Sequence, residues 1–255
     1  MIKKLAISLI LLFISTNAFA SGGQNSALHP KQLKWEFDGF FGRFDRASIQ
    51  RGFQVYKEVC ASCHNIKLFS YRNLEKAGFS EDEVKQIASE YTVIDGPNDE
   101  GDMFERPALP SDKFVGPFEN ENAARAANGG ALPPDLSLII KARMDGANYV
   151  YSLLRGYKEA PKHFELAQGK HYNPYFEGRQ ISMIPPLSDD ELVEYNDGTY
   201  ATKEQMTIDV VNFLQFVAEG ETEHRKKMGI RSMLFLFILA ILFIIAKKRI
   251  WSKLD

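Results

Sequence analysis

The two cysteines of this chain, Cys60 and Cys63, and the histidine after them, His64, form the pentapeptide Cys-Ala-Ser-Cys-His. Thiols at this spacing can form thioether bonds with the two vinyl groups of one porphyrin, and the adjacent imidazole can then bind its iron. The pentapeptide therefore predicts covalent attachment of one haem c, with His64 as an axial ligand. So large a cofactor would also give long irregular segments of the chain something to pack around.

A zinc site and a redox dithiol are the alternatives for these cysteines. Structural zinc usually takes four ligands, and no second Cys or His pair is suitably spaced, since His163 and His171 lie eight positions apart and far downstream. A thioredoxin-like thiol pair would follow a strand in a βαβ pattern, whereas Cys60 ends a predicted helix. A scaffold held by several disulfides is excluded, because the chain has only 2 cysteines.

The second axial ligand decides between electron transfer and binding of small molecules. The sequence offers these candidates: Met103, Met144, Met183, Met206, His29, His163 and His171. Met206 lies on an apolar helical stripe and Met144 adjoins a predicted helix, so packing is the expected role of both. Met183 is favoured, because Pro185 and Pro186 hold its segment extended and out of a helix. The residues alone leave the other candidates open.

The fold class expected from the sequence is mostly α, a cytochrome-c-like haem domain with long loops. Apolar residues recur at helical spacing in 46–60 and from Thr202 onward. An acidic helix is expected over 80–90, and one or two short helices within 137–157. Two helix starts match the capping box, Ser80 with Glu83 and Thr202 with Gln205. Clear strand alternation is scarce, and segments rich in Gly and Pro connect the helices.

Residues 1–20 have the pattern of a secretory signal peptide. Lys3 and Lys4 precede an apolar stretch, and Ala18-Phe19-Ala20 provides the small-x-small pattern that a signal peptidase cleaves. An uncleaved anchor helix is the alternative, although the apolar stretch is short for a membrane span.

Residues 229–247 are predicted to form a C-terminal transmembrane helix, with a buried core helix as the alternative. Four basic residues flank the segment on each side, so the charge distribution does not set the orientation of the helix in the membrane. The orientation follows from the signal peptide, which predicts that residues 21–228 are an exported c-type haem domain and 248–255 a cytoplasmic tail.

The formal net charge of -2 argues against a nucleic-acid-binding protein, and 19 Phe and 10 Tyr argue against disorder. Residues 75–105 nevertheless contain ten acids and two bases, a local charge of -8, and a second acidic group lies within 189–197. These acids form either a solvated face or a surface that steers a basic redox partner.

Motifs along most of the chain resemble the cytochrome c1 family, the haem subunits of quinol–cytochrome c oxidoreductase (bc1) complexes. They lie at 51–57, 128–137, 149–157, 173–176, 183–186, 195–199 and 224–229. The resemblance implies one haem c, thioether bonds from Cys60 and Cys63, and His64 and Met183 as iron ligands. It implies that Arg143 pairs with a haem propionate. The other implied pocket positions are Asn128, Pro133, Pro134 and Tyr149.

The resemblance also implies a function and a location. The chain would accept an electron from a Rieske iron–sulfur protein and pass it to cytochrome c, without bond-making chemistry of its own. Cytochrome b and Rieske subunits would be its partners in a dimeric complex, with no nucleic acid. It would cross the bacterial inner (cell) membrane once, with the haem domain on the periplasmic side. A tethered electron shuttle and a haem sensor or peroxidase with an open sixth position are the alternatives.

One departure from the family is apparent. Some bacterial members carry an additional disulfide near the methionine loop, and this chain has no cysteines to form it. Rigidity of that loop is therefore expected to come from its prolines and from packing.

Overall fold

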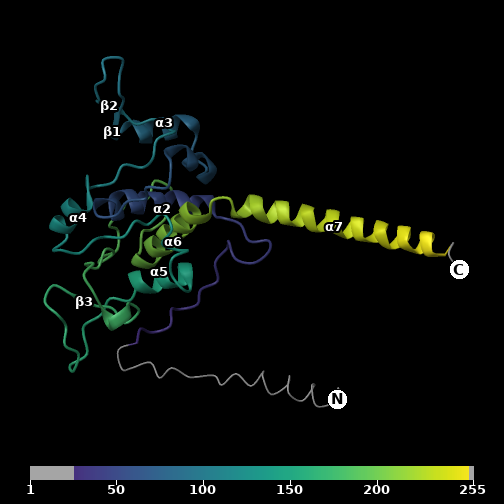
Figure 1. The fold of residues 1–255 in the computed structure, drawn as a ribbon. Coiled ribbons are helices and arrows are strands. Elements are labelled where there is room, and N and C mark those ends of the chain that lie inside the picture. Colours follow the sequence, from purple (N-terminus) through teal and green to yellow (C-terminus); the bar gives the residue numbers. More distant parts are fainter. Residues whose placement is uncertain (1–25, 253–255) are drawn as a thin grey trace, which may run out of the picture.

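Helices provide most of the regular structure in residues 26–252, the part of the chain that this computed structural model describes (Figure 1). The α-helices are α2 (Arg46–Glu58), α3 (Glu81–Ser89), α4 (Glu121–Ala127), α5 (Gly146–Leu154), α6 (Lys203–Glu219) and α7 (Thr222–Trp251). Three 3-10 helices are η1 (Cys60–Ser62), η2 (Tyr71–Ala77) and η3 (Glu177–Arg179). The strands are β1 (Thr92–Asp95), β2 (Phe104–Pro107), β3 (His171–Tyr172) and β4 (Gln180–Ile181). The prediction of a mostly α fold is confirmed, and the predicted signal peptide lies outside the described residues.

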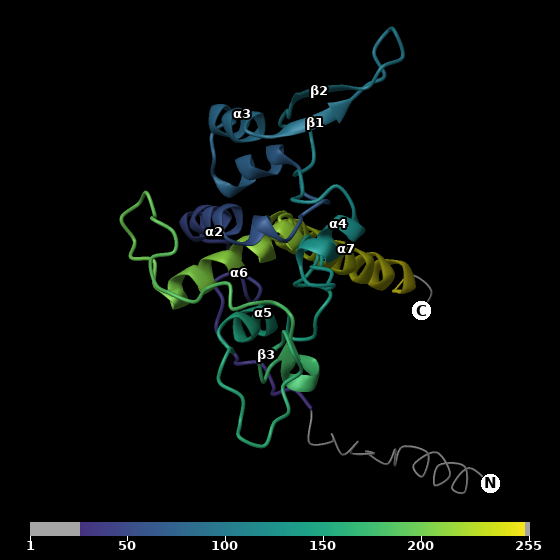
Figure 2. The same ribbon diagram turned by 90° about the vertical axis from the view of Figure 1, so that its left-hand side faces the viewer.

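Helices α2 and α6 pack against each other at the centre of the domain (Figures 1 and 2). Their predicted apolar stripes are buried, with Ile49 and Phe53 on α2 and Phe213 on α6 among the core residues. Gly52 lies where the two backbones touch, because a Cβ added there would stand only 1.9 Å from the carbonyl oxygen of Asp209. Glycine is therefore required for this helix pair to approach so closely.

A buried ion pair joins the same two helices. Arg51 donates from Nε and Nη2 to the Asp209 carboxylate at 2.9 and 3.1 Å, and Ser48 Oγ donates to it at 2.7 Å. The third guanidinium nitrogen, Nη1, lies 2.8 Å from Asp197, a residue of the loop before α6. The backbone N–H of Thr199 and, next, the guanidinium of Arg51 lower the pKa of Asp197 to about 2. The motifs at 51–57 and 195–199 are thus bound to each other directly.

The two predicted helix starts differ in their capping. At α3 both halves of the capping box form, since Ser80 Oγ accepts from the Glu83 N–H and Glu83 accepts from the Ser80 N–H. At α6 only Thr202 Oγ1 accepts, from the Gln205 N–H at 3.0 Å. The Gln205 side chain donates to Asp209 instead. The prediction of a second capping box is therefore only half correct, because the side-chain amide of Gln205 donates to the buried Asp209 carboxylate.

The remaining elements are short. The segment 137–157 contains one α-helix, α5. The seven-residue helix α4, which is capped by Asn120 and lies before that segment, was not predicted. Strands β1 and β2 pair in antiparallel register from Thr92↔Pro107 to Asp95↔Phe104, and β3 pairs with β4. In both views the β1–β2 hairpin extends from the body of the domain as a narrow arm beside α3 (Figures 1 and 2).

Helix α7 leaves the domain as a single long arm (Figure 1). It is long and apolar enough to cross a membrane, and none of its most apolar 18-residue window is buried in the domain. The helix begins several residues before the predicted 229–247 span. Its first turn is held to the domain by Glu223, which accepts from the Phe44 N–H at 2.9 Å and pairs with Arg46 at 2.9 Å.

Candidate haem-binding site

The pentapeptide lies where α2 ends and the chain tightens into η1. The N–H groups of Cys63 and His64 both donate to the Cys60 carbonyl, at 3.1 and 2.9 Å. Tyr56, one turn earlier on α2, donates its hydroxyl to the His64 carbonyl at 3.2 Å. Both cysteines are free thiols. The fully packed helix pair α2–α6 therefore fixes the backbone that carries the two thiols and the imidazole.

The thiol chemistry argues against a redox dithiol. Burial, with a smaller effect of Cys63, raises the pKa of Cys60 to about 12. Redox-active thiols in Cys-x-x-Cys motifs have a lowered pKa. In addition, the motif follows a helix and not a strand.

The ring of His64 is oriented by one strong hydrogen bond. Its Nδ1 lies 2.8 Å from the carbonyl oxygen of Pro134. A carbonyl only accepts, so Nδ1 carries the proton and Nε2 keeps a free lone pair. Burial lowers the pKa of His64, partly offset by the Pro134 bond and by Asp135. A neutral imidazole with its second nitrogen bound to a carbonyl is the form in which histidine binds metals.

Pro134 is held in place by the residues that follow it. Leu136 N–H donates to the Asn65 carbonyl at 2.8 Å. In the opposite direction, the N–H of Lys67 donates to Asp135 at 2.9 Å, and that of Leu68 donates to Ser137 Oγ at 3.0 Å. Residues 134–137 thus form a strap along residues 64–68. Asp135 and Ser137 were missed as site residues, although the motif at 128–137 contains them.

The other predicted pocket positions fall into two groups. Asn128 caps α4, donating Nδ2 to the Ala124 carbonyl at 2.7 Å, and so shapes the start of the loop that contains Pro133. Tyr149, on α5, is half-buried and lies near the guanidinium of Arg143. Burial is the main cause of its raised pKa. Arg143 itself is exposed and donates to the Ala142 carbonyl at 3.2 Å.

Met183 is held on a separate loop. It follows β4 by two residues and is half-buried, and its carbonyl accepts from the Tyr157 hydroxyl at 3.1 Å. Its neighbour Ser182 accepts from Lys170 Nζ at 2.5 Å. Tyr157 was not singled out from the sequence, although it ends the motif at 149–157. The strand pair and the Tyr157 hydroxyl hold this loop in addition to the prolines and packing expected from the sequence.

The remaining ligand candidates differ in their surroundings. Met206, on α6, is fully buried in the hydrophobic core, which confirms its packing role. Met144 is 90% exposed, so the expectation that it packs is wrong. It lies in the turn before α5, next to Asp145, whose φ is 61°. Met103 is also exposed, at 60%. His29 and His163 are exposed, and His171 pairs within the β3–β4 hairpin.

The donor set fits a c-type haem. It offers two free thiols at thioether spacing, a neutral imidazole with a free nitrogen, and a thioether on a rigid loop. In residues 26–252, no three His, Cys, Asp or Glu side chains gather where they could hold a metal ion.

A mostly helical domain with this donor set and one long apolar C-terminal helix has the features of a membrane-anchored c-type cytochrome. Comparison with known sequences narrows this class. A sequence model of the Cytochrome C1 family matches residues 35–254, and the chain belongs to that family.

Similar proteins come from plants, fungi and bacteria. "Cytochrome c1 1, heme protein, mitochondrial" of Arabidopsis thaliana is 50% identical over 245 residues, covering 96% of this chain and 79% of that protein. "Cytochrome c1" of Rhodospirillum rubrum is 47% identical over 258 residues, covering 95% and 93%. "Cytochrome b-c1 complex catalytic subunit, mitochondrial" of Candida albicans is 46% identical over 251 residues, covering 98% and 87%.

Proposed function

We propose that this chain is the haem-bearing electron-transfer subunit of a quinol–cytochrome c oxidoreductase. It accepts one electron from a Rieske iron–sulfur protein and passes it to cytochrome c. The observation that carries the proposal is the His64–Pro134 bond, which prepares an iron ligand directly after two free thiols. A c-type haem is the cofactor of the family, and when bound it supplies one-electron redox chemistry.

The residues have distinct roles in this proposal. Cys60 and Cys63 hold the haem by thioether bonds, while His64 and Met183 bind its iron. Arg143 pairs with a propionate, since its exposed guanidinium can form the fork that a carboxylate matches. The loop containing Asn128, Pro133 and Pro134, together with Tyr149, borders the cofactor.

Membrane attachment and partners follow from α7 and the relatives. The proposed protein loses residues 1–20, exposes 21–228 to the periplasm and crosses the inner membrane once through residues 229–247 of α7, leaving 248–255 in the cytoplasm. "Cytochrome b/c1" of Bradyrhizobium diazoefficiens is 44% identical over 276 residues, covering 98% of this chain and 40% of that protein. The name of this relative supports cytochrome b as a neighbour of the chain. The proposed complex is dimeric and also contains a Rieske subunit.

Acidic side chains are available to guide a basic acceptor. In the hairpin connection, Asp99, Glu100 and Asp102 are exposed, and so are Asp189 and Glu191 in the loop after Met183. Other acids of the two stretches are paired, for example Asp95 with Arg106 and Glu90 with Lys57. We propose that the exposed acids increase the rate at which cytochrome c associates, an effect that salt weakens.

Isolation of the chain from detergent-solubilised membranes tests the proposed assembly. We expect a b-type cytochrome and a Rieske protein to co-purify with it through several columns. A membrane-tethered electron shuttle would be purified without these two proteins. A sensor or peroxidase would bind carbon monoxide readily in the reduced state, which iron bound by both His64 and Met183 resists.

Cys60→Ala is expected to reduce covalent haem incorporation severalfold, because one of two thioether bonds can no longer form. Haem staining after denaturing electrophoresis measures the attached haem. Ser62→Ala is the matched control, since Ser62 lies between the cysteines and donates only to the Val59 carbonyl and weakly to Cys63. Full staining of the Cys60 variant would contradict the attachment.

A further inference from the structure

Two exposed aromatic side chains lie side by side on a short loop before α2. Phe40 is 54% exposed and Phe41 is 81% exposed, and their rings meet edge to face at 5.0 Å. An exposed pair of this size carries apolar surface that gains free energy when it leaves water, at about 25 cal/mol for each Å² removed. Adjacent exposed aromatics of this kind mark an interaction surface more often than a single exposed residue does.

The loop is built to present these rings. Its base is closed by hydrogen bonds from Asp38 N–H to the Trp35 carbonyl at 3.1 Å and from Arg43 N–H to the Glu36 carbonyl at 2.9 Å. Gly42 allows the turn to close, because a Cβ there would stand 2.0 Å from the Asp38 carbonyl oxygen. The exposed pair is therefore held in place by a formed turn.

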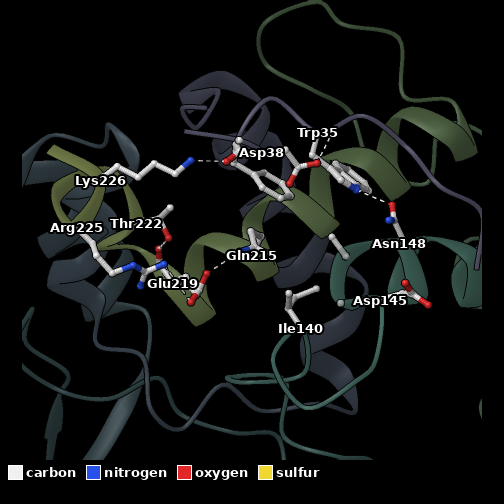
Figure 3. Close-up of a pocket in the computed structure, with 14 residues that line it drawn as sticks. Trp35, Asp38, Ile140, Asp145, Asn148, Gln215, Glu219, Thr222, Arg225 and Lys226 are labelled. Carbon is white, nitrogen blue, oxygen red and sulfur yellow. Dashed lines mark hydrogen bonds and ion pairs between the residues drawn. The ribbon is translucent and has the colours of Figure 1, made fainter. Parts of the chain in front are cut away.

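The base of the loop is also anchored in the core. Trp35 and Phe37 are buried and stack at 5.5 Å. Trp35 Nε1 donates to Asn148 on α5 at 2.8 Å, a contact visible in Figure 3. Two aromatic residues of the segment thus point into the domain, while the next two point away from it.

The same loop is tied to the start of α7. Lys226 Nζ donates to the Phe37 carbonyl at 2.7 Å and to the Gly42 carbonyl at 3.1 Å, on the two sides of the exposed pair. Figure 3 shows Lys226 reaching from α7 to the segment that contains Asp38. In Figure 1 the purple segment before α2 projects in the direction in which α7 leaves the domain.

The position of Lys226 along α7 sets the depth of the loop. Lys226 lies four residues before Ile230, where the apolar part of α7 begins. At about 1.5 Å per residue, this is roughly 6 Å along the helix axis. The headgroup layer on each side of the hydrocarbon core is about 5–8 Å thick. The loop is therefore level with the headgroups of the membrane that α7 enters.

We propose that Phe40 and Phe41 insert into the interfacial layer of this membrane and give the domain a second point of attachment beside α7. The basic residues Arg225, Lys227 and Arg231 flank the start of the apolar part of α7 and suit lipid phosphates. A single helix would leave the domain able to tilt and rotate at the membrane surface. A second attachment restricts both motions. The inference rests on the membrane span in the proposed function and not on its redox partners.

Photo-crosslinking in the native membrane tests this attachment. p-Benzoylphenylalanine replaces Phe41 in one variant and Phe40 in a second, within the full chain in its assembled complex. The control places it at Phe104, an exposed aromatic residue at 43% on strand β2, far from α7 in Figures 1 and 2. After irradiation, mass spectrometry of the labelled peptides identifies phospholipid adducts, and haem staining confirms that each variant folds.

We expect at least tenfold more phospholipid adduct at position 41 or 40 than at position 104. Equal yields at the three positions would overturn the proposal. Adducts formed mainly with another subunit would also overturn it, because the loop would then be a protein contact. Extraction with alkaline carbonate is the separate check on the span: release of the chain would show that α7 does not cross the membrane, whatever the loop contacts.

Discussion

Met183→Leu is expected to lower the reduction potential by roughly a few tenths of a volt, within the range of about 0.8 V that axial ligands cover. Leucine has nearly the volume of methionine, so the loop between β4 and the two prolines should keep its shape. It has no sulfur, however, and the iron should become open to external ligands. Potentiometric titration and carbon monoxide binding to the reduced protein measure the two effects.

Met206→Leu is the matched control for this substitution. Met206 is fully buried in the α2–α6 core, so the same exchange should leave the potential unchanged and alter only the stability. Met103→Leu tests one of the exposed candidates. If the potential followed Met103 and stayed constant for Met183, the ligand assignment would be wrong.

Gly52→Ala should destabilise the folded domain by about 2 kcal/mol or more. Alanine is favoured in a helix by about 1 kcal/mol, which alone would stabilise α2. The added Cβ, however, would stand 1.9 Å from the Asp209 backbone oxygen and 2.8 Å from Phe213 Cβ. Neither neighbour is the flexible end of a side chain, so the two helices must move apart. The thermal unfolding midpoint should fall by roughly 4–8 °C, measured by circular dichroism.

Gly229→Ala provides the comparison for Gly52. Gly229 is also helical, and a Cβ there would meet no atom within 4 Å. This variant should unfold at or slightly above the temperature of the unmodified chain. Equal midpoints for the two variants would show that α2 and α6 do not touch at Gly52.

Local sequence patterns predicted the regular parts of the fold. The stripe of Ile49 and Phe53 and the pair of Ser80 with Glu83 depend on residues three or four positions apart, and both are present. Patterns of this range do not show which distant group captures a side chain. Gln205 was assigned to a cap, but it binds Asp209, whose burial beside α2 depends on tertiary packing. The seven residues of α4 are too few for a clear periodicity.

The sequence suggested the residues of the candidate site but not the contacts that hold them in place. The pentapeptide and the prolines after Met183 are visible in the sequence because their chemistry depends on close spacing. The bonds from His64 to Pro134 and from Tyr157 to Met183 join residues 70 and 26 positions apart. Local sequence patterns do not predict contacts between residues so far apart in the chain. The exposure of Met144, in the turn before α5, is a further feature that local spacing did not predict.

The ion pair of Arg51 and Asp209 has a consequence for the order in which the domain folds. The two residues are 158 positions apart, and the segment between them contains every proposed haem ligand. Contact between the two helices closes the chain between them into one loop. Contacts that form later within this loop then cost less conformational entropy. We therefore expect the helix pair to form before the strap and the methionine loop, so that a polypeptide still without its cofactor already has the frame on which both are assembled.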